Sequence, residues 1–244
     1  MNTLKTTLGG AIALALSAGA MASDFNVEIG GQYVDFDVTK GYGADATVFF
    51  QPVSIQQGPF AEAPFINRAS NLGVAYLRQE DGDFDVYNFG GEFYIDNVYV
   101  AASYSRFSNG FSLNDYDFRL GYMVADNTRV TVGYNRQELP FGLDIDRYTV
   151  GARHLMLLTA DTALSLEADI GIADADKNRF AYDLSADYYL TRSFSLGARY
   201  SGIGSDDQWG VGTRFFFTPR FSAGAEYTRD SGDDIFALRL AARF

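Results

Sequence analysis

The feature that most constrains this chain is a strict alternation of apolar and polar residues that recurs in many segments. In the last segment, DDIFALRLAARF, Arg239 and Arg243 share one face. The opposite face is wholly apolar and carries Phe236, Leu238, Leu240, Ala242 and Phe244. A period of two residues is that of a β-strand, and no segment keeps the 3.6-residue period of a helix over a helix length. The sequence therefore predicts an all-β fold.

The N-terminal segment has the layout of a secretory signal peptide. Lys5 precedes an apolar run at 8–16, and the segment ends in small residues at 20–22. We therefore predict a signal peptide at 1–22 and one folded domain at 23–244. The chain has no cysteine, which excludes a disulfide scaffold, a thiolate metal site and an N-terminal lipid anchor, since each needs a thiol.

Charge and composition narrow the class further. The chain has 31 Asp and Glu against 19 Lys and Arg, a net charge of −12, which argues against a nucleic-acid partner because such a partner needs a basic face. Aromatic residues make up 16% of the chain, yet beyond the predicted signal peptide no apolar run reaches the ~18 residues of a membrane helix. The exported chain is thus rich in Tyr and Phe but has no helix that could span a membrane.

Connections of two sizes alternate along the chain. The tight ones include 96–97, 191–193 and 218–219, and the longer, acidic ones include 80–83, 108–115, 139–146, 174–178, 205–207 and 230–234. We predict about fourteen antiparallel strands between Phe25 and Phe244, with twelve and sixteen as the alternatives. An even number of strands with short turns at one end is typical of an outer-membrane β-barrel.

The expected fold is a transmembrane, up-and-down β-barrel. Lipid offers no hydrogen-bond partner, so a sheet in a membrane must close and leave no free edge. A water-soluble sandwich is the alternative, but the polar faces here carry Arg, Asp or Glu on nearly every strand, which a packed core would exclude. Outward aromatic residues near both strand ends would form two girdles: Phe180 and Tyr188, Trp209 and Phe217, and Phe236 and Phe244.

The last segment also resembles the signal by which assembly machinery recognises outer-membrane barrels. The residues that carry this resemblance are Phe236, Leu238, Leu240 and Phe244. This strand must in addition close against the first strand, FNVEIGGQYV, because a frayed end would leave an open edge.

One segment, FFQPVSIQQGPFAEAPFINRAS, interrupts the hairpin rhythm between the second and third strands. Its residues 52–53, 58–63 and 67–70 resemble a motif of the putative general bacterial porin family. The resemblance implies a porin in the outer membrane of a Gram-negative cell. On the residues alone, an ordinary periplasmic turn with a short helical piece is the alternative.

The alternation also predicts which charged residues face the lumen and line the pore. These are Glu28, Glu92, Arg119, Arg153, Glu167, Asp169, Asp183, Asp187, Arg199, Arg214, Glu226, Arg239 and Arg243. Arginines concentrate on the last four strands and acids on the ninth and tenth. Such a separation would set a transverse field that selects polar or charged solutes. The alternative is a ladder of ion pairs that fills a closed lumen.

The sequence indicates no catalytic residues, no metal site and no cofactor. The single histidine, His154, falls on an apolar face without the partners of a catalytic base.

We expect passive diffusion of small hydrophilic solutes, with a closed-lumen structural or adhesive surface barrel as the alternative. The expected partners are outer-membrane lipid, lipopolysaccharide and the barrel-assembly machinery. The acidic loops could also hold divalent ions, although Asp is a common turn residue. The oligomeric state stays open.

Overall fold

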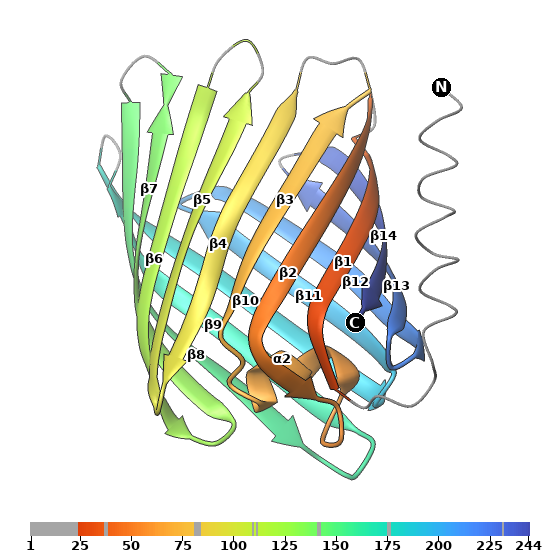
Figure 1. Ribbon diagram of the computed structural model, residues 1–244. Coiled ribbons are helices and arrows are strands. Elements are labelled where there is room, and N and C mark those ends of the chain that lie inside the picture. Colours follow the sequence, from red (N-terminus) through yellow and green to blue (C-terminus); the bar gives the residue numbers. More distant parts are fainter. Residues whose placement is uncertain are drawn as a thin grey trace.

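A computed structural model describes residues 24–36, 39–80, 84–108, 110, 112–140, 143–174, 177–230 and 232–244. The predicted signal peptide at 1–22 lies outside these residues. Within them, no helix is long and apolar enough to cross a membrane. The fold is a closed antiparallel β-barrel of fourteen strands (Figure 1), which confirms the predicted fold class and strand number.

Each strand pairs with its two neighbours in the chain, and β1 pairs with β14 to close the barrel. The strands are β1 (Asp24–Asp35), β2 (Lys40–Ser54), β3 (Asn71–Gln79), β4 (Asp85–Ile95), β5 (Val98–Ser108), β6 (Ser112–Ala125), β7 (Thr128–Leu139), β8 (Leu143–Leu157), β9 (Ala163–Asp174), β10 (Asn178–Thr191), β11 (Phe194–Ile203), β12 (Asp206–Thr218), β13 (Phe221–Asp230) and β14 (Asp233–Arg243). Two short helical pieces, η1 (Phe60–Glu62) and α2 (Ala63–Ile66), lie in the β2–β3 connection at the lower end of the barrel in Figure 1. We call this end the plug end and the opposite end the rim end.

The seam between β1 and β14 runs in register from Glu28–Arg243 to Asp35–Phe236. Beyond β14, the Phe244 amide donates to the Val27 carbonyl at 2.9 Å, and the Phe244 carbonyl accepts from the Asn26 amide at 2.6 Å. The last residue of the sequence is therefore part of the closing ladder.

The barrel is apolar outside and polar inside. Trp209 and Phe217, near opposite ends of β12, are 43% and 63% exposed on the outer face. Between them Gly210, Gly212 and Arg214 point to the lumen, as the pleat requires. This inverted arrangement suits a lipid solvent, because the outer face is apolar and the closed ladder pairs the backbone of every strand with two neighbours.

The strands extend further at the rim end than the sequence predicted. β6 starts at Ser112, β8 at Leu143, β12 at Asp206 and β14 at Asp233. The prediction of longer acidic loops at 108–115, 139–146, 205–207 and 230–234 is therefore wrong. The long connection lies at the plug end instead, between β2 and β3.

Acidic residues are accommodated in these strand ends by a repeated contact with tyrosine. In the described residues, six tyrosine hydroxyls donate to a carboxylate or amide oxygen closer to the rim, and each of the six rings packs on a cross-strand aromatic ring. The hydroxyl pairs are Tyr33–Asp35, Tyr76–Asp85, Tyr104–Asn114, Tyr134–Asp146, Tyr200–Asp207 and Tyr227–Asp234, at 2.6 to 3.1 Å. The ring pairs are Tyr33–Tyr42, Tyr76–Tyr87, Tyr104–Tyr116, Tyr134–Tyr148, Tyr182–Tyr200 and Trp209–Tyr227, with centroids 4.9 to 5.5 Å apart. We call this set the rim tyrosine belt.

Two lumen-facing glycines should differ sharply in their tolerance of a methyl group. A Cβ at Gly171 would lie 1.9 Å from the Tyr148 carbonyl oxygen, whereas a Cβ at Gly224 would have the Thr213 carbonyl oxygen as its nearest neighbour, at 3.4 Å. Because the first clash is with backbone, Gly171→Ala is expected to cost about 3 kcal/mol of unfolding free energy. Gly224→Ala should stay within about 0.5 kcal/mol of wild type. Urea titration of the refolded barrel in detergent checks both values, and equal midpoints would contradict the close approach at Gly171.

Candidate functional site

The structure places all thirteen charged residues predicted to line the pore on the lumen side of their strands. Eight of them belong to two networks of ion pairs across the barrel: Glu28, Arg214, Arg239 and Arg243 form one, and Arg119, Arg153, Glu167 and Asp169 the other. Asp187, Arg199 and Glu226 line a cavity, and Asp183 lines a smaller one. Glu92 takes a lumen position on β4, next to the outward Phe93.

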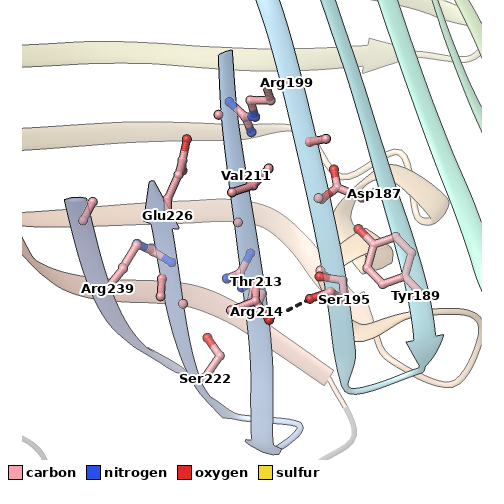
Figure 2. Close-up of a pocket in the computed structure, with 18 of the residues that line it drawn as sticks. Asp187, Tyr189, Ser195, Arg199, Val211, Thr213, Arg214, Ser222, Glu226 and Arg239 are labelled. Atoms are coloured by element: carbon pink, nitrogen blue, oxygen red, sulfur yellow. Dashed lines mark hydrogen bonds between the residues drawn. The ribbon is translucent and has the colours of Figure 1, made fainter. Parts of the chain in front are cut away.

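The main cavity of the lumen measures about 440 Å³ and lies against the wall formed by β10 to β14 (Figure 2). Its wall is rich in glycine and small polar residues, and the Thr213 hydroxyl donates to the Ser195 carbonyl at 2.9 Å. Ala61 and Glu62 of the β2–β3 connection also line it. The cavity therefore borders the connection that folds into the plug end.

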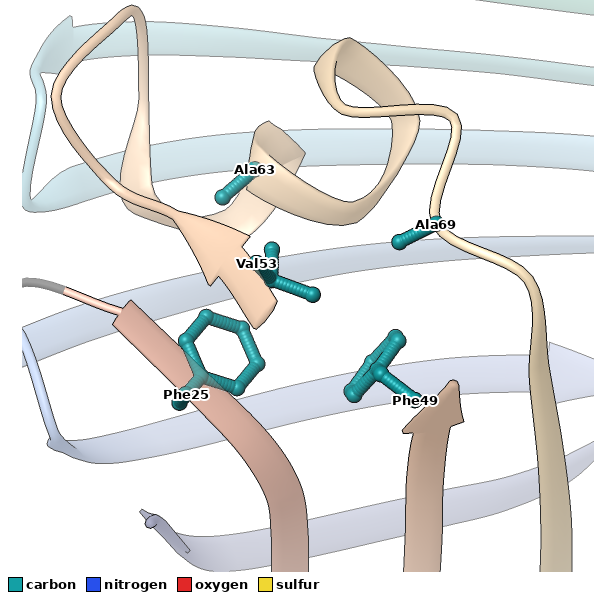
Figure 3. Packing of buried hydrophobic residues seen from close by; sticks show 5 residues of the cluster. All are labelled: Phe25, Phe49, Val53, Ala63 and Ala69. Atoms are coloured by element: carbon teal, nitrogen blue, oxygen red, sulfur yellow. The ribbon is translucent and has the colours of Figure 1, made fainter. Parts of the chain in front are cut away.

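We call residues 55–70 of the β2–β3 connection the plug, because they fold inside the plug end of the barrel. Ala63 and Ala69 of the plug pack on Phe25, Phe49 and Val53 of β1 and β2 (Figure 3). Gly58 has φ +62°, a left-handed conformation that a residue without a Cβ adopts at no steric cost. On the other side, Phe65 packs with side chains of β6, β8, β9 and β10. The plug thus bridges opposite walls.

Glu62 is the polar anchor of the plug. Its side chain is buried, with the residue only 3% exposed, and its two carboxylate oxygens accept from Arg153 at 2.7 Å and from the Tyr189 hydroxyl at 2.7 Å. A buried carboxylate is tolerated only when its oxygens are paired in this way. The ion pair joins the plug to β8 and the hydroxyl joins it to β10.

Two further arginines hold the plug through its backbone. Arg192, in the β10–β11 turn, donates to the carbonyls of Gly58 (2.8 Å) and Ile55. Arg243 of β14 donates to the Phe60 carbonyl at 2.8 Å. Because these arginines come from distant strands, the plug is fixed to several parts of the barrel at once.

The lumen charges are not separated into a basic and an acidic wall. Glu28 accepts from Arg214, Arg239 and Arg243 at 3.3, 3.0 and 2.6 Å, and Asp45 pairs with Arg239 at 2.6 Å. Closure brings β1 and β2 beside β14, so their carboxylates neutralise arginines of the last strands. The expected transverse field between separated walls is therefore not what the structure shows.

Comparison with known proteins agrees with this architecture. The model of a protein family described as putative general bacterial porin matches residues 1–145 and 139–244. The chain belongs to this porin family.

One solved structure contains the same fold at high similarity. The outer membrane protein Omp33 of Acinetobacter baumannii is 27% identical, with a TM-score of 0.77 over 92% of this chain and 100% of that chain. The KdgM porin, in a complex with disordered oligogalacturonate, is matched at 11% identity and a TM-score of 0.49, over 89% of this chain and 99% of that chain. No curated protein sequence matches.

The porin is a channel of the Gram-negative outer membrane. Family and fold are those of a channel. His154 lies on the outer face, where its Nδ1 is 2.8 Å from the Thr128 hydroxyl. In the described ranges, no group of three or more His, Cys, Asp or Glu is arranged to hold a metal ion.

Sequence reasoning missed several lumen residues of the porin. Asp45, Arg129 and Arg147 each lie between two outward-facing residues of a strand. Applying the alternation rule along the whole of β2, β7 and β8 would have predicted them as lumen residues. Glu62 carried no such signal, because the plug has no strand period. Its pointers were the unusual density of prolines around it and its place in the family motif at 58–63.

Proposed function

We propose that small hydrophilic solutes diffuse passively through the lumen, along the side where the 440 Å³ cavity lies. The thirteen predicted lining residues, together with Asp45 and Glu62, form the polar surface of this path. The observation that carries the proposal is the cavity itself, since a lumen filled by ion pairs would leave no such space. The size of the cavity suits small polar solutes.

We propose that the plug end faces the periplasm, and the plug narrows the path there. Ala61 and Glu62 form part of the cavity floor, and the Glu62–Arg153 ion pair lies beside it. A solute therefore passes beside the plug or requires the plug to move. The tight anchoring of Glu62 also favours the second candidate, a closed-lumen structural or adhesive barrel.

Single-channel recording in a planar bilayer distinguishes the two functions. Stable ohmic steps from the refolded protein are expected for an open path, and a silent bilayer with folded protein would favour the closed barrel. Folding is checked separately by the shift between heated and unheated samples on a gel.

An open path should be cation-selective. Asp183 and Asp187 of β10 face the lumen, and among the described residues neither has a Lys or Arg nitrogen within 4.0 Å. Carboxylates that lack a close ion pair raise the local concentration of cations. The reversal potential in a KCl gradient should show preference for K⁺, and the double variant Asp183→Asn/Asp187→Asn should move the permeability ratio toward one. Glu138→Gln, on the outer face, is the control, and an equal shift there would assign selectivity to the rim.

We also propose the lipid and assembly partners expected from the sequence. Lys40, Arg78 and Arg106 are exposed near the rim on the outer face, where lipopolysaccharide phosphates would lie. The outer face of β14 presents Phe236, Leu238, Leu240 and Phe244, which supports a role as the assembly signal. Removal of residues 1–22 by signal peptidase completes the proposal, and mass determination of the exported protein tests that step.

A further inference from the structure

Three charged side chains of the cavity differ from the others in having no close ion pair. Arg153, Arg214 and Arg239 each lie within 4.0 Å of a carboxylate. Arg199, Asp187 and Glu226 line the same cavity, yet none of them has an oppositely charged group of the described residues within that distance. A charge that faces a cavity without a partner can pair with a solute instead.

The three groups lie close together on β10, β11 and β13. A Cβ added at Gly197 would lie 2.3 Å from Asp187 Oδ1, and a Cβ at Gly210 would lie 3.8 Å from Glu226 Oε1. Arg199 is two residues from Gly197 on the same strand face and is directly opposite Gly210 on β12. Arg199 therefore has one carboxylate on each side, as Figure 2 shows.

Glycine provides the space in front of these groups. Gly197, Gly210 and Gly212 all line the cavity, and at Gly212 an added Cβ would make only ordinary contacts, the nearest at 3.4 Å. The wall beside the three charged side chains therefore consists of glycine backbone without side chains. The guanidinium and the two carboxylates extend over this backbone into the cavity. A solute can approach all three groups at once.

We propose that Arg199, Asp187 and Glu226 form a solute-binding subsite for zwitterions with a net charge of +1, carrying one carboxylate and two ammonium or guanidinium groups. The inference rests on the proposed diffusion function and names its substrate class. The guanidinium of Arg199 binds the solute carboxylate, and the carboxylates of Asp187 and Glu226 bind the two cationic groups. Charge-assisted hydrogen bonds of this kind are the strong ones.

Other solute classes fit the subsite less well. An anion would be repelled by two carboxylates and attracted by only one guanidinium. A neutral polyol would form, with any of the three groups, no charge-assisted hydrogen bond in which both partners are charged. A dication without a carboxylate would leave Arg199 unpaired.

Three matched probes test this assignment on the refolded barrel in detergent. L-lysine carries all three groups, cadaverine lacks the carboxylate, and L-norleucine lacks the side-chain ammonium. Ligand-observed saturation-transfer NMR gives the dissociation constant of each. Lysine is expected to bind more tightly than either analogue by about fivefold, the worth of one partly solvated hydrogen bond.

Variants assign each contact. Arg199→Gln should weaken lysine binding about fivefold without weakening cadaverine binding, because the lost positive charge repels a dication. Glu226→Gln should weaken the binding of both lysine and cadaverine. Arg229→Gln is the matched control, because Arg229 is exposed on the outer face of β13, where it pairs with Asp234.

Equal affinities for the three probes, or an equal loss of lysine affinity in Arg229→Gln, would overturn the subsite. The binding measurement does not depend on conduction, so ohmic steps without lysine binding would reject the subsite alone, whereas a silent bilayer would reject the proposed open path.

Discussion

Replacing Glu62 with alanine is expected to release the plug while the barrel stays closed. Glu62 is 3% exposed and is the nearest acid to Arg153, whose other carboxylate, on Glu167, is at 4.0 Å. Removing one member of a buried pair leaves the other uncompensated, at a cost of 3 to 5 kcal/mol in typical cases. Arg153 keeps some contact with solvent and its weaker partner Glu167. We therefore expect a loss at the lower end of this range, about 3 kcal/mol of the free energy that holds the plug in place.

A loss of that size raises the population of the open plug on the order of a hundredfold. Hydrogen exchange of residues 58–68 should accelerate accordingly, with the strand amides still protected. Single-channel conductance should rise at the same time, because the floor of the cavity is no longer fixed. Glu62→Gln keeps the partner for Tyr189 and should have a smaller effect.

The control for Glu62→Ala is Glu138→Gln on the outer face, which should leave exchange and conductance unchanged. If the plug amides of Glu62→Ala exchange as slowly as in wild type, the ion pair is not what anchors the plug. If the strand amides also lose protection, the plug supports the whole barrel rather than only its mouth.

Deleting Arg243 and Phe244 is expected to abolish folding. The deletion removes the last bonds of the β1–β14 seam, and it removes Arg243, which is 3% exposed and donates to Glu28 at 2.6 Å and to the Phe60 carbonyl at 2.8 Å. Several hydrogen bonds of about 1 kcal/mol each and a buried ion pair of about 3 kcal/mol approach the whole stability of a typical domain. Refolding into detergent should yield no heat-modifiable band.

Phe244→Ala separates closure from recognition by the assembly machinery. It keeps the backbone bonds to Asn26 and Val27 and removes only the ring. Refolding in vitro should match wild type, whereas the amount in the outer membrane of cells should fall. A normal amount of Phe244→Ala in the outer membrane would refute the assembly signal. Failure of the variant to refold in vitro would instead assign the ring a structural role.

The sequence predicted the fold, the strand number and the lumen face because these follow from a local rule. In a strand the side-chain direction reverses at every residue, so one outward residue fixes the phase of the whole strand. Arg119 and Asp183 could therefore be placed on the lumen face without any knowledge of their neighbours.

The contacts between lumen residues could not be predicted in the same way. Glu28 and Arg243 are 215 positions apart and meet only because the barrel closes. Glu62 lies in a connection without a period, where no rule gives the direction of a side chain. The acidic residues near the rim have the composition of loops because Asp favours turns. Tyrosine hydroxyls nevertheless donate to four of them within the sheet, Asp85, Asp146, Asp207 and Asp234.

The rim tyrosine belt has a consequence for experiments in artificial bilayers. Its six hydroxyls already donate within the protein, to Asp35, Asp85, Asn114, Asp146, Asp207 and Asp234. The rings therefore meet the surrounding amphiphile through their apolar edges and faces, and have no hydroxyl proton left to offer to a particular headgroup. The preference of these six tyrosines for a given depth then depends on hydrocarbon thickness rather than on headgroup chemistry, so the belt keeps its depth in simple phosphatidylcholine. Lys40, Arg78 and Arg106 still offer donors to anionic headgroups.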